Sequence, residues 1–322
     1  VIPLSGTILR DCVADPAVLS TRFTADGSFS LHCDSFAESF HSSCGALEEA
    51  NSKFVLPAPL DSFPSGRCLR GLDVCFGLGY NTAALMAALP NVGGPNLQCW
   101  ALELDRAPLR LALAEPSFIA LWPEHVVASL KALSANGCWQ DLRRQQSVQM
   151  LWGDARQQLH YMPKDLRLDL ILLDAFSPGK CPQLWSREFM QSLAALLAPG
   201  GRLLTYCRAA AVRNSLRHAG LELRSLLPKP GEVTGWSSGT LALLPNEYEQ
   251  YSPEIGPGWR GLSEMEEEHL QTRAGVPYRD PTGTDTAALI LKRRQQEQAF
   301  VDLPSTSAWK RKWGLARQAC NS

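Results

Sequence analysis

Short apolar runs alternate with segments of helical periodicity between Leu69 and Leu244. The apolar runs predict strands at Leu69–Cys75, Leu97–Leu104, Ser147–Trp152, Leu168–Leu173, Arg202–Cys207, Leu221–Leu227 and Thr240–Leu244. The periodic segments predict helices at Thr82–Leu89, Pro108–Leu133 with a break at Pro116, Ser186–Leu197 and Ala209–Ala219. Strands separated by helices form parallel βαβ units, so the pattern predicts a doubly wound, mostly parallel α/β sheet of Rossmann-like type. No helix separates the last two strands, which we expect to pair as an antiparallel hairpin at one edge.

The flanking segments have different patterns and divide the chain into residues 1–66, 67–245 and 246–322. In the first part, two β-rich runs flank Asp26-Gly27, a pair typical of tight hairpin turns. Residues 34–54 are compatible with a helix, and a proline-rich linker follows. In the last part, residues 246–270 carry seven acidic side chains and residues 292–322 carry seven basic ones. We expect this C-terminal part to be largely helical, with solvated charged faces.

Composition and cysteine usage restrict the class of protein. With 45% hydrophobic and 20% charged residues, the 322-residue chain has an ordinary globular composition. No apolar run approaches the ~20 residues that cross a bilayer, and no leader pattern is present at the N-terminus, so we expect a cytoplasmic protein without a membrane segment. The ten cysteines form no CxxC pair and indicate reduced thiols. The His32-Cys33 and His41…Cys44 cluster has unusual zinc spacing, so no metal is expected.

An acidic residue stands at or just after the end of each of the first four predicted strands: Asp73, Glu103, Asp154 and Asp174. The carboxyl ends of parallel strands meet at one edge of the sheet, where open α/β folds bind their ligands. The carboxylate after the second strand can accept both ribose hydroxyls, because it has two acceptor oxygens. The one after the third can accept from an adenine amino group. The arrangement predicts an S-adenosyl-L-methionine site.

The loop after the first strand belongs to the same predicted site. Its sequence is Asp73-Val-Cys-Phe-Gly77-Leu-Gly79-Tyr-Asn81, and glycines there let the backbone approach a ligand closely. A dinucleotide fold would require Gly-x-Gly-x-x-Gly, whereas Thr82 occupies that third position. We therefore expect Gly77, Gly79 and Asn81 to bind the cofactor together with the four carboxylates.

The segment after the fourth strand carries the predicted chemistry. It begins at Asp174, which faces the sulfonium side of the cofactor in this architecture. Methyl transfer is an in-line displacement and depends mainly on positioning. An amine with a pKa near ~10 must lose a proton before it attacks, and Asp174 can take that proton or orient the amine. Phe176 and Trp185 can stack on a base, with core packing as the alternative, and Lys180 is a candidate substrate contact.

Taken together, these segments resemble the methyltransferase domain of the tRNA 5-methylaminomethyl-2-thiouridine biosynthesis (MnmC) family, especially its standalone members. The resemblance covers most of the chain and rests on Thr24-Ala-Asp-Gly-Ser-Phe-Ser-Leu, Glu38-Ser-Phe-His41-Ser, Gly45-Ala-Leu-Glu48-Glu49-Ala, the glycine loop, Asp174-Ala-Phe-Ser-Pro178-Gly-Lys180-Cys-Pro182-Gln-Leu-Trp185 and Val276-Pro-Tyr-Arg-Asp280-Pro. Two positions depart from the family pattern, since Cys75 stands where glycine is usual and Cys181 where asparagine is usual.

The resemblance implies transfer of a methyl group to the aminomethyl group of 5-aminomethyl-(2-thio)uridine at the wobble position of tRNA. The resemblance also implies that Asp174 and Phe176 of this chain lie at the reaction centre. The segment after the last predicted strand holds no Gly-x-Gly-x-x-Gly, so the flavin-dependent oxidase domain of the bifunctional members is not expected and the chain should have transferase activity alone.

A tRNA substrate requires a basic surface, because phosphate contacts supply much of the affinity. On the predicted helix Ala209–Ala219, Arg213 and Arg217 are four residues apart and share one face. We expect this pair to contact tRNA, with Lys310–Lys312 as further candidates. A solvated helix face is the alternative.

Two other functions stay open on the sequence. An aminopropyltransferase uses a similar sheet with a decarboxylated cofactor, but it would need an acidic wall for a polyamine and an additional Asp in the glycine loop, which Phe76-Gly-Leu-Gly79 lacks. A non-catalytic RNA-binding protein on the same fold is the second, and the four retained carboxylates argue against it.

Overall fold

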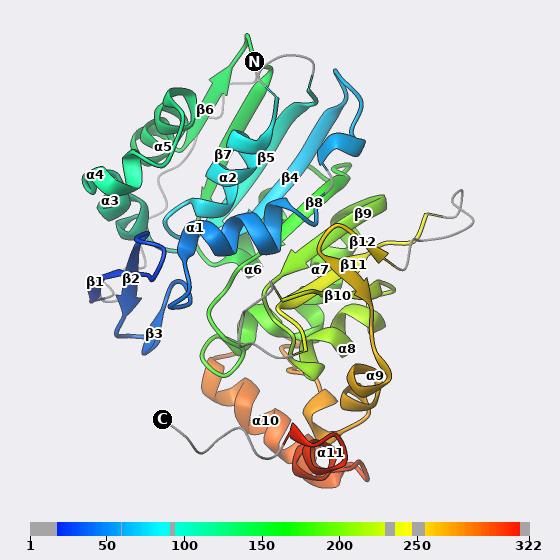
Figure 1. The fold of residues 1–322 in the computed structure, drawn as a ribbon. Coiled ribbons are helices and arrows are strands. Elements are labelled where there is room, and N and C mark those ends of the chain that lie inside the picture. The colour runs from blue at the N-terminus through cyan, green and yellow to red at the C-terminus, as the bar shows by residue number, and fades with distance from the viewer. Residues whose placement is uncertain (1–17, 59, 91–93, 229–235, 247–254, 316–322) are drawn as a thin grey trace.

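A mixed β-sheet forms the centre of the molecule in the computed structural model, which describes residues 18–58, 60–90, 94–228, 236–246 and 255–315 (Figure 1). Within these ranges the sheet has the order β12-β13-β10-β11-β9-β8-β4-β5-β7-β6. Five neighbouring strands are parallel: β9 (Leu197–Thr205), β8 (Leu168–Leu173), β4 (Cys68–Val74), β5 (Asn96–Glu103) and β7 (Gln146–Trp152). The doubly wound α/β fold expected from the sequence is confirmed.

Antiparallel strands extend both edges of this parallel core. They are β6 (Cys138–Asp141) at one edge and β11 (Gly239–Leu243), β10 (Glu222–Leu226), β13 (Trp259–Gly261) and β12 (Ile255–Gly256) at the other. β10 and β11 form the expected antiparallel pair, but its expected place at an edge is wrong. β11 lies between β9 and β10, and two strands from the C-terminal part continue the sheet beyond β10. The short strand β6 was not predicted.

Helices cover both faces of the sheet. They are α2 (Tyr80–Ala88), α3 (Ala107–Ala114), α4 (Pro116–Ile119), α5 (Glu124–Asn136), α6 (Ala155–Gln158), α7 (Arg187–Leu196) and α8 (Ala210–His218). Pro116 starts a new helix, because proline lacks the N–H that a helix interior needs. Ser186 caps α7 by accepting from the Phe189 N–H, so that helix begins where expected. α7 ends at Leu196, before Pro199-Gly200-Gly201 as expected, and these three residues lie within β9.

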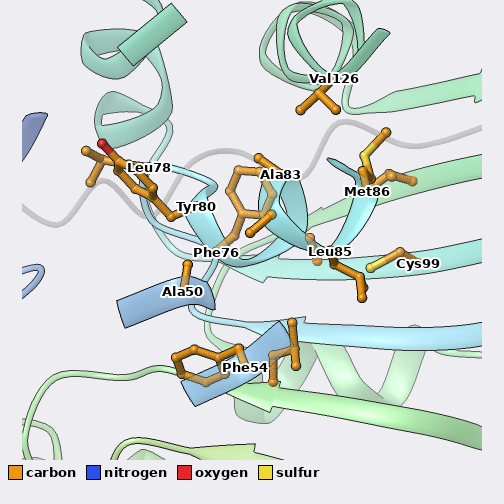
Figure 2. Close-up of a cluster of buried hydrophobic side chains, with 14 of the residues drawn as sticks. Ala50, Phe54, Phe76, Leu78, Tyr80, Ala83, Leu85, Met86, Cys99 and Val126 are labelled. Atoms are coloured by element: carbon orange, nitrogen blue, oxygen red, sulfur yellow. The ribbon is translucent and has the colours of Figure 1, made fainter. Parts of the chain in front are cut away.

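The N-terminal part forms a small sheet of β1 (Leu19–Phe23), β2 (Phe29–Cys33) and β3 (Glu38–Ser39). β1 and β2 pair antiparallel around Asp26-Gly27, which confirms the hairpin. The predicted helix over residues 34–54 starts only at α1 (Ala46–Glu49), which continues as the π-helical turn η1 (Ala50–Val55); β3 occupies the earlier portion. Figure 2 shows Ala50 and Phe54 packed in one buried cluster with Phe76 and Leu85, so this part shares a core with the main sheet.

Alternation along β8 shows how the two faces are filled. Leu170 and Leu172 pack with α2 and α5, whereas Ile171 and Leu173 pack with α7 and α8. Because side chains alternate along a strand, a strand covered on both faces requires a nearly continuous apolar run such as Leu168–Leu173, in which Asp169 is the one polar residue. This strand begins and ends at the predicted residues.

The C-terminal part contains α9 (Glu264–Leu270), α10 (Ala287–Phe300) and α11 (Thr306–Lys312), and Figure 1 shows α10 and α11 together at one end of the molecule. Its acidic and basic side chains pair with each other and with the main domain. Glu266 binds Arg213 and Arg260, Glu267 binds Arg217, and Glu268 binds Lys312. The expected solvated charged faces are therefore partly ion-paired. Glu247, Glu249 and Glu254 lie outside the described residues. No helix in the described ranges is long and apolar enough to cross a membrane.

Candidate active site

A cavity of about 630 Å³ lies at the carboxyl ends of the parallel strands. Its wall includes Cys75 after β4, Glu103 of β5, Asp154 after β7, Asp174 after β8 and Tyr206 after β9. β4 has β5 on one side and β8 on the other, so the strand order reverses at this point. Such a reversal opens a crevice between the loops that leave the sheet, and a volume of this size suits a nucleoside-sized cofactor.

Glu103 is anchored at the cofactor side of this cavity by backbone donors. The Gly77 N–H donates to Oε2 (2.7 Å), while the N–H groups of Leu104 and Asp105 donate to Oε1 (2.7 and 2.9 Å). Burial raises the pKa of this carboxyl, and the backbone donors oppose the shift. Each carboxylate oxygen has two acceptor positions, and three of the four are used, so Glu103 retains one position, on Oε2, for a ligand's hydroxyl group.

The glycines of the glycine loop are required by the backbone conformation and by packing within the protein. Gly77 and Gly79 have φ of 56° and 95°, values that favour glycine. A Cβ on Gly79 would lie 2.8 Å from the Phe76 ring, and one on Gly77 would lie 3.2 Å from the Phe40 ring. Gly77 lines the cavity. Gly79 serves to start α2 in a tightly packed position.

Asp73 does not face the cavity, which corrects its assignment as a direct cofactor ligand. Its side chain is fully buried, and its Oδ2 accepts from Thr82 Oγ1 (2.6 Å). Burial raises the pKa of Asp73 to about 7. Oδ1 has no partner among the described residues. Asp73 therefore joins β4 to α2 beneath the glycine loop.

Asp154 lines the cavity but is also committed to structure. It caps α6 by accepting from the Arg156 N–H (2.9 Å), and it pairs with the Arg156 guanidinium (2.6 Å). The same guanidinium contacts Asp280 (2.7 Å), whose side chain is 1% exposed. This contact ties the tail segment 276–280 to the site. Asp154 has correspondingly less capacity left for a ligand than the sequence suggested.

Asp174, directly after β8, lines the cavity together with residues of the N-terminal part. Its Oδ2 accepts from Asn81 Nδ2 (2.8 Å), so Asn81 orients Asp174, and Asn81 itself does not line the cavity. Burial, followed by the nearby Glu49 carboxylate, raises the pKa of Asp174 to about 7. A carboxyl of this pKa exchanges a proton readily near neutral pH, which suits proton transfer.

The loop after Asp174 is held by aromatic and polar contacts. Phe176 lines the cavity, where it stacks on Phe36 (4.6 Å between ring centroids) and meets Phe40 edge-on (5.1 Å). Tyr206 donates its hydroxyl to the Ala175 carbonyl (2.8 Å). Trp185 is fully buried and donates from Nε1 to the Phe176 carbonyl (2.7 Å). Its expected stacking on substrate is therefore wrong, because it supports the loop from the core. Lys180 is exposed and lies outside the cavity wall.

Arg213 cannot contact tRNA in this structure, because its side chain is 1% exposed. Its guanidinium donates to Glu266 (2.9 Å), Thr240 (2.8 Å) and Ser237 (3.0 Å). Arg217, at 39% exposure, makes two bonds to Glu267 (2.8 and 2.7 Å). Helix α9 therefore covers the face that was expected to bind RNA.

The N-terminal part contributes cavity residues that the sequence reasoning did not assign to the site. Glu38, His41, Glu49 and Lys53 line the cavity. Glu38 accepts from the Ser177 N–H (3.1 Å) and Oγ (2.8 Å), which links β3 to the loop after Asp174. Glu38, His41 and Glu49 belong to the N-terminal segments that carried the family resemblance, and Lys53 lies three residues after the last of them, so that resemblance was the available signal. The described residues contain no group of three potential metal-ligating side chains.

Cys75 occupies a left-handed backbone position, with φ of 67°. A side chain in this region costs ~1–2 kcal/mol, which accounts for the glycine usual in the family. We expect the free energy of unfolding of Cys75→Gly to exceed that of Cys75→Ala by roughly 0.5–1 kcal/mol. This difference is the backbone cost of the alanine side chain minus the stabilisation that glycine's greater flexibility gives to the unfolded chain. Urea denaturation of the two variants measures the difference. An alanine variant equal to or more stable than the glycine variant would show that position 75 is unstrained.

Comparisons with known proteins identify relatives of this chain. A model of the S-adenosyl-L-methionine-dependent methyltransferase family matches residues 120–231. The bifunctional protein MnmC of tRNA 5-methylaminomethyl-2-thiouridine biosynthesis from Azoarcus sp. is 32% identical over 222 residues, which cover 65% of this chain and 33% of that protein. The chain thus spans about a third of the length of that curated relative. The uncharacterized protein MJ0670 of Methanocaldococcus jannaschii is 25% identical over 280 residues, covering 85% of this chain and 71% of that protein.

A solved structure extends the similarity over most of the fold. The crystal structure of MNMC2 from Aquifex aeolicus superimposes with a TM-score of 0.72 at 26% identity, covering 88% of this chain and 86% of that one. The fold and the cavity define an S-adenosyl-L-methionine-dependent methyltransferase. Within that class the chain is similar to MnmC proteins, and the resemblance seen in the sequence is confirmed.

The cavity fits S-adenosyl-L-methionine by its donor set and its size. Glu103 offers a carboxylate at the end of the second core strand, and Asp154 offers one after the third. Gly77 adds backbone to the same wall. Glu103 would hold a ribose hydroxyl, Asp154 the adenine amino group and Gly77 the methionine moiety.

Proposed function

We propose that this protein methylates the aminomethyl nitrogen of 5-aminomethyl-(2-thio)uridine at the wobble position of tRNA. The observation that carries the proposal is the position of Asp174, on the wall of the cavity beside Phe176 and held by Asn81. Similarity to MnmC proteins supports the substrate class. A tRNA substrate also places the protein in the cytoplasm.

The residues would act as follows. Glu103 and Asp154 bind the cofactor, which supplies an electrophilic methyl group when bound. Asp174 accepts a hydrogen bond or the proton from the substrate amine, which exposes the nitrogen lone pair. Phe176, held between Phe36 and Phe40, offers an aromatic surface beside the uracil. Lys180, exposed on the following loop, is the candidate contact to phosphate.

One observation favours a second candidate function. Glu38, Glu49 and Asp174 all line the cavity, and a polyamine aminopropyltransferase requires acidic walls of this kind. The same wall also suits a single aminomethyl group. The two functions differ in the group transferred and in the acceptor.

The proposal is tested with purified protein, labelled S-adenosyl-L-methionine and tRNA that carries 5-aminomethyl-2-thiouridine. We expect label in 5-methylaminomethyl-2-thiouridine, identified by nucleoside mass spectrometry. A parallel reaction with putrescine and decarboxylated S-adenosylmethionine tests aminopropyl transfer. Spermidine formation without tRNA methylation would replace the proposal, and cofactor binding without either product would favour a non-catalytic RNA-binding protein.

A further inference from the structure

The N-terminal part contributes several residues to the wall of the cavity that Asp174 also lines. Glu38 of β3 binds Ser177 three residues after Asp174, and Phe36 and Phe40 pack against Phe176. These contacts join the segment to the loop that carries the predicted proton acceptor. Any side chain that this segment directs into the cavity is therefore held in a defined position relative to Asp174.

Glu49, the last residue of α1, is such a side chain. It lines the cavity at 12% exposure, and its Oε2 accepts from the Ser42 N–H (3.0 Å). Its Oε1 accepts from Lys53 Nζ, and Lys53 is 13% exposed on the same wall. Burial acts against ionisation, but Lys53 and the hydrogen bonds outweigh it, so the pKa of Glu49 lies below its ordinary value. The group is therefore a carboxylate at neutral pH.

Glu49 and Asp174 act on each other within this cavity. Burial is the largest cause of the raised pKa of Asp174, and the Glu49 carboxylate is the second. The Lys53 ammonium opposes the shift. Two acidic groups facing one partly desolvated space repel each other, and a cation between them would relieve that repulsion. His41 on the same wall does not supply the cation, because burial lowers its pKa to about 4 and leaves the ring neutral.

We propose that Glu49 is the residue that binds the protonated amine of the substrate and so restricts the enzyme to alkylammonium substrates. The proposal deepens the proposed function and rests on it for the tRNA part. A primary ammonium has three N–H donors, enough to contact both Glu49 and Asp174. Lys53 competes with the substrate for Glu49 and thereby weakens substrate binding.

The proposed step balances in protons and electrons. The substrate ammonium, held by Glu49, gives one proton to Asp174 and becomes a neutral amine. Its lone pair then forms the N–C bond to the methyl group while the S–C bond pair returns to sulfur. The sulfonium becomes a neutral thioether, and the product leaves as a secondary ammonium.

The test compares Glu49→Gln and Lys53→Gln with the exposed control Glu124→Gln on tRNA carrying 5-aminomethyl-2-thiouridine. Glutamine keeps the size of Glu49 but has a single acceptor oxygen, so it can keep the bond from Ser42 while it loses the one from Lys53. We expect Glu49→Gln to raise the tRNA KM at least tenfold with kcat within threefold of wild type and cofactor Kd unchanged. Lys53→Gln should lower the KM or leave it unchanged, and the control should match wild type.

A purely structural ion pair predicts the opposite pattern, because losing either partner would then have the same effect. Equal increases in KM for Glu49→Gln and Lys53→Gln, with equal losses in Tm, would overturn the proposal. An unchanged KM in Glu49→Gln would overturn it as well.

A binding measurement separates this inference from the proposed function. Calorimetry on protein loaded with S-adenosylhomocysteine compares 5-aminomethyluridine with 5-hydroxymethyluridine. Preference for the amine in wild type, lost in Glu49→Gln, supports the role of Glu49 even if no tRNA is methylated. Equal preference in both proteins rejects that role even if tRNA methylation succeeds.

Discussion

Asp174→Asn is expected to abolish methyl transfer while leaving the affinity for S-adenosyl-L-methionine close to that of wild type. Asparagine keeps an oxygen that can accept from Asn81, so the local geometry is preserved. It cannot take a proton from an ammonium, and the nitrogen lone pair then stays unavailable. Loss of an interaction needed mainly in the transition state lowers kcat rather than raising KM. Single-turnover kinetics and calorimetry measure the two effects separately.

Glu103→Ala provides the matched control for that experiment, since it acts at the other side of the cavity. Removal of Glu103 leaves the ribose hydroxyl of the bound cofactor without its proposed acceptor, and it also frees the N–H groups of Gly77, Leu104 and Asp105. We expect cofactor affinity to fall by roughly 10- to 100-fold, equivalent to ~1–3 kcal/mol for unpaired polar groups. An Asp174→Asn protein with near-normal kcat would show that another group receives the proton.

Arg213→Met is expected to lower the free energy of unfolding by about 3–5 kcal/mol. Arg213 and Glu266 are 1% and 0% exposed, and removal of the cation leaves the Glu266 carboxylate with Arg260 as its one remaining ion-pair partner among the described residues. Several neutral acceptors, including Thr240 and Ser237, lose their donor as well. Urea denaturation followed by circular dichroism measures the change.

Arg217→Gln is the control on the same helix. Its ion pair with Glu267 is partly exposed on both sides, and pairs of this kind contribute ~0–1 kcal/mol. The double variant Arg213→Met/Glu266→Met should be less destabilised than Arg213→Met alone, because no charge is left buried. If Arg213→Met were as stable as Arg217→Gln, the buried network would not stabilise α9 on α8. Weaker tRNA binding by an Arg213 variant would accordingly report loss of folding and not loss of a phosphate contact.

The strands of the parallel core could be predicted because their signal is local. Leu168–Leu173 is apolar at every position but Asp169, and such a run indicates a strand covered on both faces of its sheet. This prediction does not depend on the sequence of the other segments. The place of β11 between β9 and β10 could not be predicted in this way. It depends on which strand pairs with which, and β13, far along the chain, covers the edge that β10 would otherwise present.

The candidate site residues also include some that could be predicted from the sequence and some that could not. The strand-end positions of Glu103, Asp154 and Asp174 follow from parallel topology, and all three line one cavity. Trp185 and Arg213 are of residue types that stack on bases and bind phosphates, but both side chains are buried and cannot make these contacts. Their hydrogen-bond partners lie on other elements, and for Arg213 the partner Glu266 is 53 residues further along the chain.

The sequence by itself determined the α/β class, the order of the core elements, the glycine loop and the acidic strand ends, because hydrophobic periodicity and turn chemistry act between near neighbours. The tertiary structure alone determined that Glu38 meets Ser177 across 139 residues and that Asp280 meets Arg156 across 124. It also determined that Glu49 shares a cavity with Asp174. Contacts of this kind depend on how the helices and the sheet pack together. A local sequence pattern does not identify a contact partner that lies more than a hundred residues away.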